Sequence, residues 1–270
     1  MTNNADLFHE LHRGPGVLLL SNGWDAGSAK LLESLGARAV ATTSAGLAWT
    51  HARPDGQALA VEQLVATVRS IARVLAVPLT ADIEAGYSPD PAKVGENVAA
   101  IVGEGAVGIN LEDGSEPPEL TARKIGAARK AADRAGVRLF INARTDVYLK
   151  ALVDEQQRVS ETLRRARMFR DAGADGFFVP KVLEADAIRE IGGQCGMPLN
   201  ILAWRGLPDP EALAALGVRR LSSGSAIAQA AWGRTRAAAR EFLANGCPDS
   251  LFDGAMLSPE LNGLFAARPR

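Results

Sequence analysis

The chain has 270 residues, with 30 Lys and Arg residues against 31 Asp and Glu residues, which gives a formal net charge of −1. This balance excludes a nucleic-acid or anionic-membrane surface as the main partner, because both require concentrated positive charge. The hydrophobic fraction of 47% is too high for a disordered chain. Two cysteines, Cys195 and Cys247, are too few for a disulfide framework. The sequence has no signal-peptide pattern, and no apolar run approaches the length of about 18 residues that a membrane span needs. We therefore expect a cytoplasmic protein.

Short aliphatic runs alternate with longer amphipathic segments along the chain. The runs expected as strands are 17–21, 38–42, 78–82, 107–111, 138–142, 176–180, 199–203 and 219–223. The segments expected as helices are 25–35, 60–74, 92–103, 118–135, 155–171, 184–194, 209–216 and 225–244. Runs that are apolar throughout are typical of parallel strands covered on both faces. Eight such units favour an α/β fold, a (β/α)8 barrel that forms one domain over 1–270, and an open doubly wound sheet is the alternative.

Two segments lie outside this repeat. Residues 5–12 are expected to form a short helix that closes the bottom of the barrel. The helical tail at 246–270 contains the apolar groups LFDGAML and LNGLF. Exposed apolar groups favour association, so we expect this tail to pack on the barrel or on a neighbouring subunit.

Polar side chains gather where the third, fourth and fifth strands end, which is the end of a barrel that carries chemistry. Side chains alternate between the two faces of a strand. Same-face pairs are therefore expected for Asp82 with Glu84, Asn110 with Glu112, and Asn142 with Arg144. Three neighbouring strands thus deliver several carboxylates and one guanidinium to the same opening.

Converging carboxylates repel each other unless a cation or a proton intervenes. A set of oxygen ligands without His or Cys favours Mg²⁺, or Mn²⁺, over zinc. Asp82 is expected to bind the metal directly, with Glu84, Glu112 and Asp55 acting through water. Arg144 offers a planar fork for a substrate carboxylate. This chemistry polarises a substrate carbonyl and stabilises a developing enolate.

Four weaker signals have a functional and a plain structural interpretation. The small-residue turn at 42–46 offers backbone N–H groups to an oxyanion, or is an ordinary loop. The segment 222–225 lies where barrels often bind phosphate, or caps the next helix. Lys181 is a Schiff-base candidate or a solvated lysine. His51 is a general-acid candidate or a plain loop residue.

Further candidates flank the strand ends. Asp25 is expected to cap the first barrel helix, and Trp24 beside it either lines the pocket or belongs to the core. Trp24, Asn142 and Asn200 are included among the residues expected to contact substrate.

Several short motifs occur in a characteristic order. They are ADIEAGY at 81–87, INLEDG at 109–114, INARTD at 141–146, TTSAG at 42–46 and PDG at 54–56. In this order the chain resembles the isocitrate lyase/phosphoenolpyruvate mutase superfamily over nearly its whole length. The resemblance implies a (β/α)8 barrel whose last helix is exchanged between subunits, giving a homodimer or homotetramer. It also implies Mg²⁺ as the cofactor and a small 2-oxo or 2-hydroxy carboxylic acid as the substrate.

The resemblance also implies roles for individual residues. Asp82 matches the direct metal ligand, and Glu84 and Glu112 match the acidic positions around the metal. Asp55 matches a catalytic aspartate on a mobile loop, and Arg144 matches the arginine that holds a substrate carboxylate. The turn that holds the substrate through its backbone amides corresponds to Thr43 and Ser44.

Two departures from the superfamily pattern narrow the reaction. True isocitrate lyases have a Lys-(Lys/Arg)-Cys-(Gly/Ser)-His loop after the fourth strand, and this chain has EDGSEPPELTARK at 112–124. Lys181 follows Pro180 where such lyases have a glutamate and the mutases a histidine. The remaining prediction is a lyase that cleaves or decarboxylates an oxaloacetate-like acid. The alternatives are a phosphonopyruvate-type C–P mutase or hydrolase, a metal-free Schiff-base aldolase using Lys181, and a 2-oxo acid binding protein without turnover.

Overall fold

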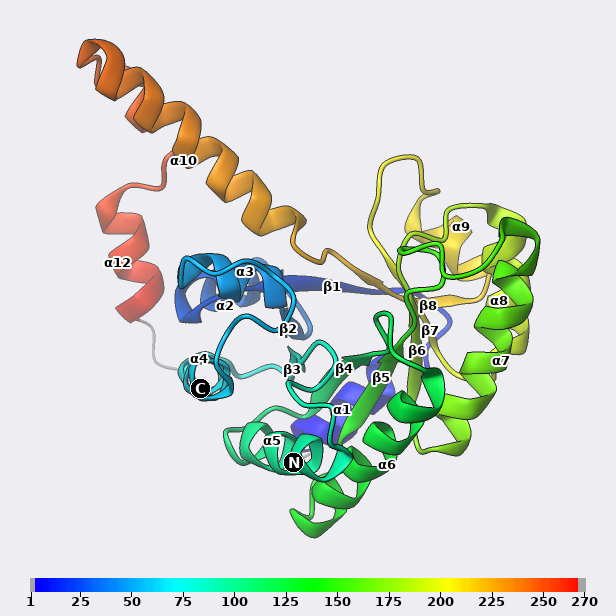
Figure 1. Cartoon of the computed structure of the whole chain (residues 1–270). Helices are drawn as coiled ribbons and strands as arrows, with labels where there is room; N and C mark the ends of the chain where they lie inside the picture. The colour runs from blue at the N-terminus through cyan, green and yellow to red at the C-terminus, as the bar shows by residue number, and fades with distance from the viewer. Residues whose placement is uncertain (1–2, 267–270) are drawn as a thin grey trace.

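The computed structural model describes residues 3–266 as a closed barrel of eight parallel strands in chain order (Figure 1). The strands are β1 (Leu18–Gly23), β2 (Val40–Thr42), β3 (Leu79–Asp82), β4 (Gly108–Glu112), β5 (Phe140–Arg144), β6 (Gly176–Val179), β7 (Leu199–Leu202) and β8 (Val218–Ser222). Pairing of β1 with β8 closes the ring. The (β/α)8 prediction is therefore confirmed, and the open-sheet alternative is wrong.

Helices surround this ring and cover its outer face. Those that follow strands are α2 (Ala26–Ser34), α3 (Ser44–Thr50), α4 (Val61–Ala72), α5 (Pro91–Gly103), α6 (Pro118–Arg134), α7 (Arg158–Asp171), α8 (Ala185–Gln194), α9 (Pro210–Ala215) and α10 (Ala226–Asn245). A 3-10 turn, η1 (Glu155–Gln157), precedes α7. The main apolar core lies between strands and helices, where Val98 and Ile101 of α5 pack with strand residues such as Ile109. All four residues of β6 are buried, as expected for a strand covered on both faces.

A short helix at the amino end of the barrel, α1 (Asn4–Leu11), closes it from below. Phe8 is fully buried and meets Phe140 of β5 edge to face, with 5.4 Å between ring centroids. His12 stacks on the same Phe140 ring at 4.1 Å. Offset and edge-to-face aromatic pairs add stability beyond their buried area. The predicted helix at 5–12 is thus confirmed as the closure of the barrel base.

The segment 42–46 differs from the predicted loop, because it begins helix α3. Thr43 caps this helix by accepting a hydrogen bond from the Gly46 N–H at 3.4 Å. A Cβ at Gly46 would approach Trp24 Cβ to 2.9 Å and Thr43 Cγ2 to 2.6 Å. The small residues of this segment therefore allow close packing of a helix that its short length concealed from sequence analysis.

Helix α10 projects from the barrel, and the chain then returns through α11 (Asp249–Phe252) and α12 (Ser258–Ala266) (Figure 1). Ala228 is the buried residue of α10. α12 contacts α2, so part of the tail packs on its own barrel, while residues 267–270 of the predicted tail lie outside the described part. Among the helices of residues 3–266, none combines the length and apolarity needed to cross a membrane.

Backbone strain is concentrated at the carboxyl end of the barrel. Within residues 3–266, the non-glycine residues with left-handed φ are Ala52, Gln57, Glu84, Tyr87, Ala151 and Lys181. Ala52 and Gln57 lie in the loop between α3 and α4, and the other four lie in the loops that follow β3, β5 and β6. In the loops that precede strands this conformation is taken by glycine, for example Gly136 at φ 67°. A side chain in this region costs about 1–2 kcal/mol, so the strain lies where the polar strand ends meet.

Candidate active site

A cavity of about 240 Å³ opens at the carboxyl end of the barrel. Its polar lining includes Asn22, Ser44, Asp55, Asp82, Asn110 and Arg144. Its other lining residues include Phe178, Lys181, Leu202 and Trp204, which come from β6, β7 and the loops after them. The cavity therefore brings together residues from strands that are far apart in sequence.

Asp82, the last residue of β3, is the carboxylate that this strand delivers to the cavity. It accepts hydrogen bonds from Ser44 Oγ at 3.1 Å and from the Ser44 N–H at 3.4 Å. Its own N–H donates to Thr42 Oγ1 at 2.8 Å. Burial raises the pKa of Asp82, the Arg144 charge opposes this shift, and the Asp55 charge adds to it. The start of α3 thus orients the carboxylate that was predicted to bind metal.

Glu84 takes a different position from the predicted one. β3 ends at Asp82 and Glu84 has a left-handed φ of 50°, so the strand alternation does not extend to it. Its carboxylate accepts hydrogen bonds from the Gln57 N–H at 2.5 Å and from Tyr87 Oη at 2.9 Å. Burial, followed by the negative charge of Asp82, raises the pKa of Glu84 to about 7. Glu84 therefore ties down the loop that carries Asp55, and it is not a lining residue of the cavity.

Arg144 ends β5 and is held by two carboxylates. Its Nε donates to Asp146 Oδ1 at 2.7 Å and its Nη2 to Asp146 Oδ2 at 3.1 Å. Its Nη1 lies 2.5 Å from Glu112 Oε2, and β4 and β5 place these two residues directly opposite each other. Burial raises the pKa of Glu112 to about 8, Arg144 opposes that shift, and Asp82 adds to it. Glu112 thus acts first as a partner of Arg144.

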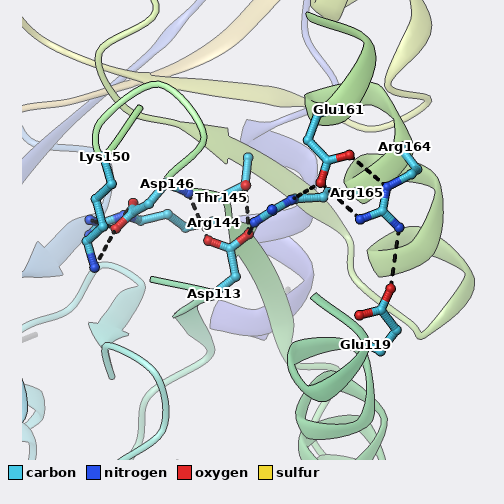
Figure 2. A network of polar contacts seen from close by, with 9 residues as sticks. All are labelled: Asp113, Glu119, Arg144, Thr145, Asp146, Lys150, Glu161, Arg164 and Arg165. Carbon is cyan, nitrogen blue, oxygen red and sulfur yellow. Dashed lines mark hydrogen bonds and ion pairs between the residues drawn. The ribbon is translucent and has the colours of Figure 1, made fainter. Parts of the chain in front are cut away.

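A buried polar network fixes the loop that carries Arg144 (Figure 2). Asp113 is fully buried and accepts hydrogen bonds from the Asp146 N–H at 2.8 Å and from Thr145 Oγ1 at 2.7 Å. Arg165 of α7 donates from Nη1 to Asp113 at 2.7 Å, and Glu161 holds the Arg165 Nε at 2.7 Å. Asp113 and Asp146 were not among the residues predicted from the sequence, although an aspartate follows each strand-end residue closely, directly after Glu112 in INLEDG and two residues after Arg144 in INARTD.

A second group of buried polar side chains lies inside the barrel, centred on Arg220 of β8. The Arg220 guanidinium is fully buried, and it donates from Nη2 to Asn110 Oδ1 at 3.2 Å and from Nε to Ser222 Oγ at 3.1 Å. Burial lowers its pKa to about 9. Asn142 donates to Asn110 Oδ1 at 2.9 Å, and Asn200 accepts from Ser222 at 2.9 Å. Asn142 and Asn200 thus touch cavity-lining residues and are not lining residues themselves.

The remaining sequence candidates have distinct positions. Asp25 caps α2 by accepting from the Ser28 N–H at 2.6 Å, as predicted. Trp24 packs against the main core and is not a lining residue of the cavity. His51 ends α3 and contacts Gln63 in an exposed position. In 222–225, Ser222, Gly224 and Ser225 line the cavity, and Ser225 precedes α10 without a side-chain cap.

The donor set of this site suits a hard divalent cation held by few protein ligands. In residues 3–266, no three His, Cys, Asp or Glu side chains are close enough to hold a metal ion together. Mg²⁺ usually keeps several waters and binds one or two carboxylates directly. Burial, and to a smaller extent the neighbouring carboxylates, raise the pKa values of Asp82, Glu84 and Glu112, and a cation near Asp82 would favour the ionised form of these groups.

The fold and cavity place this chain among (β/α)8 barrels with a small polar cavity at the carboxyl ends of the strands. The sequence profile of phosphoenolpyruvate phosphomutase matches residues 8–243, so the chain belongs to this family. It is therefore a member of the phosphoenolpyruvate mutase/isocitrate lyase superfamily, as its motifs predicted.

Individual relatives show the same relationship. The uncharacterized protein Rv1998c of Mycobacterium tuberculosis H37Rv is 35% identical over 223 residues, 81% of each chain. A solved structure from Burkholderia cenocepacia J2315, provisionally assigned as a lyase or mutase, is 33% identical with a TM-score of 0.89, over 98% of this chain and 96% of that one. An oxaloacetate decarboxylase of Pseudomonas entomophila is 27% identical over 180 residues, 65% of this chain and 62% of its own length.

Proposed function

We propose that this protein is a Mg²⁺-dependent lyase that cleaves or decarboxylates a small 2-oxo dicarboxylic acid resembling oxaloacetate. The observation that carries the proposal is the position of Asp82, which lies in the cavity between Ser44 and Arg144. Family membership and similarity to oxaloacetate decarboxylase support the same class of reaction.

A divalent cation in this site would polarise the substrate's 2-oxo group and stabilise negative charge that develops on it. Asp82 would hold the cation directly, and Mn²⁺ would suit the same oxygen ligands. Ser44 fixes the Asp82 carboxylate through two hydrogen bonds, so the ligand is oriented before substrate arrives. Pre-set orientation of this kind lowers the reorganisation needed in the transition state.

Arg144 would orient one carboxylate of the dicarboxylic substrate. Asp146 and Glu112 occupy part of its guanidinium, and the group still lines the cavity. Asn22 and Asn110 line the same cavity and offer amide groups to substrate oxygens. Asp55, on the loop between α3 and α4, also lines the cavity and would approach the substrate when that loop moves. These groups bind and orient the 2-oxo acid while C–C cleavage proceeds.

The proposal is tested by assaying a panel of 2-oxo and 2-hydroxy acids with purified protein, with Mg²⁺ and with a chelator. Oxaloacetate turnover that the chelator abolishes and Mg²⁺ or Mn²⁺ restores is the expected result. Unchanged turnover in the chelator would contradict the metal role. No product from any member of the panel, despite calorimetric binding, would favour a 2-oxo acid binding protein.

C–P chemistry is the second candidate, because the matching family is named for phosphoenolpyruvate phosphomutase. Lys181 follows β6 at the position where the mutases have a histidine, so the mutase reaction would have to proceed here with a lysine in its place. Phosphonopyruvate in the same panel separates the two reactions, since its turnover without oxaloacetate turnover would replace the C–C proposal.

We also propose that α10, α11 and α12 mediate association into a homodimer or homotetramer. On α10, Trp232 is 49% exposed and Leu243 is 82% exposed. Trp232 also lines a surface groove of about 650 Å³ with Trp49 and Arg53. Exposed apolar groups of this kind favour an interface. Sedimentation of the parent and of Trp232→Glu would test this, with dissociation expected for the variant and a monomeric parent contradicting it.

A further inference from the structure

Two cationic side chains, Arg144 and Lys181, line the cavity, and they differ in how far their charge is already compensated. Arg144 is engaged by Asp146 and Glu112 at 2.5–3.1 Å. Lys181 has no carboxylate within ion-pair distance among residues 3–266. Of these two cations, Lys181 is therefore the one free to pair with an incoming anion.

Lys181 is held at the cavity by its backbone and by an aromatic ring. Its Nζ lies 3.2 Å from the centroid of the Trp204 ring, a cation–π contact that fixes the ammonium without neutralising it. Its φ of 68° is a left-handed conformation that glycine adopts readily and lysine does not. Strain that persists at a cavity is a reason to look for a function of the strained side chain.

The barrel topology places this cation across the mouth from Asp82. Asp82 ends β3, whereas Lys181 follows β6 and Trp204 follows β7. In a closed ring of eight strands, β7 is four strands from β3, on the opposite side. A ligand whose head lies at Asp82 and Ser44 therefore extends toward Lys181 if it spans the cavity.

We propose that Lys181, seated on Trp204, binds the distal carboxylate of the substrate and so selects 2-oxo diacids over 2-oxo monoacids. This inference rests on the proposed function, because it assumes that the 2-oxo head binds at Asp82. It assigns Lys181 an electrostatic role in specificity in place of the nucleophilic role of a Schiff-base lysine.

The test compares ligands that differ only at the distal group, since 2-oxobutyrate has a methyl where oxaloacetate has a carboxylate. Calorimetry with Mg²⁺ present gives both affinities for the parent, Lys181→Met and Lys181→Arg. We expect Lys181→Met to bind oxaloacetate about 10–30-fold more weakly and 2-oxobutyrate within about twofold, because a hydrogen bond to a charged group is lost. Lys181→Arg keeps the charge and should retain most of the preference for the diacid. Lys93→Met, an exposed lysine of α5, is the control that changes neither affinity.

Lys181→Gly provides an independent check. It should lose the same preference while raising the melting temperature, because glycine relieves the left-handed strain. Equal weakening of both ligands in Lys181→Met, or no weakening, would overturn the inference. Borohydride trapping of a covalent adduct at Lys181 would also overturn it, in favour of an imine. Failure of oxaloacetate turnover with the diacid preference intact would refute the proposed reaction alone, and a parent that binds no diacid would refute both.

Discussion

At the amino end of the barrel, burial lowers the pKa of His12 to about 3, and the imidazole is neutral between Phe8 and Phe140. At the carboxyl end, burial raises the pKa of Glu84 to about 7 and that of Glu112 to about 8. The same physical cause acts at both ends, but the surroundings differ. At the base, the buried imidazoles of His9 and His12 pack against Phe140, whereas the mouth brings together opposite charges and hydrogen-bond donors.

This difference separates the two tasks of the barrel. A neutral group packed in an apolar base contributes to folding and leaves no field at the surface. Charged groups held close together at the mouth are costly to bury, but they can bind ions and stabilise developing charge. Substitutions at the mouth should therefore change activity more than stability, and substitutions at the base should do the reverse.

The largest effect is expected for Asp82→Asn at the mouth. Turnover should fall about 10³-fold or more, because polarisation by a bound metal is worth several kcal/mol. Calorimetry should show loss of Mg²⁺ binding. The melting temperature should not fall, since the raised pKa shows that the ionised carboxylate is unfavourable where it lies. Asp133→Asn, an exposed carboxylate of α6, is the control. Metal affinity equal to the parent would refute the position assigned to Asp82.

Phe8→Ala is the matching change at the base. Removing this fully buried ring should destabilise the protein by about 3–5 kcal/mol, measured by urea unfolding. Activity per folded molecule should stay within about twofold. Leu19→Ala removes a half-exposed side chain of β1 and should cost less than about 1 kcal/mol. A Phe8→Ala protein with the stability of the parent but no activity would contradict the assignment of stability to the base and activity to the mouth.

Asp113→Asn lies between these extremes, because Asp113 braces the loop of Arg144 from inside the fold (Figure 2). An amide nitrogen would face the donors that Asp113 now accepts from, so we expect a loss of about 2–3 kcal/mol in stability. A rise of about tenfold in KM should accompany a smaller change in kcat, since Arg144 is proposed to hold substrate. Arg164→Gln on the same α7, which contacts Glu161 and Glu119 at the surface, should change neither. An unchanged KM in Asp113→Asn would show that Arg144 needs no such brace.

The smallest expected effect is the pH dependence of stability that His12 causes at the amino end of the barrel. The pKa of His12 is lowered from 6.5 to about 3, so the unfolded chain binds more protons between these two values. Stability should therefore fall as pH decreases from 6.5 toward 3, by about 2 kcal/mol at pH 5 from this group. His12→Phe should lose less stability than the parent between pH 7 and pH 5. Parallel pH profiles of unfolding would show that His12 is not the responsible group.

Much of the fold was predictable because short hydrophobic runs alternate with amphipathic segments eight times along the chain. The helix that closes the base was also predicted from the sequence. Strand periodicity placed Asp82 and Arg144 at the ends of their strands. Helix α3 was missed, because it has only seven residues and begins with the small residues Ser44, Ala45 and Gly46, which resemble a turn. Its packing against Trp24 depends on contacts made only in the folded chain.

The rest of the site depends on backbone conformations and pairings that a sequence does not display. Glu84 was predicted to share a strand face with Asp82, but β3 ends at Asp82 and Glu84 has a left-handed φ of 50°. Arginine side chains are normally solvated, so the sequence did not indicate that Arg220 of β8 is buried. Its burial depends on hydrogen bonds to Asn110 of β4 and Ser222 of β8. The Asp113–Arg165 contact joins residues 52 positions apart.

The left-handed residues around the mouth also imply that the molecule does not open uniformly. Each of these residues is released from a strained conformation when its loop detaches. Local opening there therefore requires less free energy than opening of the aromatic base. Amide hydrogen exchange should accordingly be faster around Ala52 and Gln57 than around Phe8. The barrel would then admit a small molecule by brief detachment of these upper loops while its base remains closed.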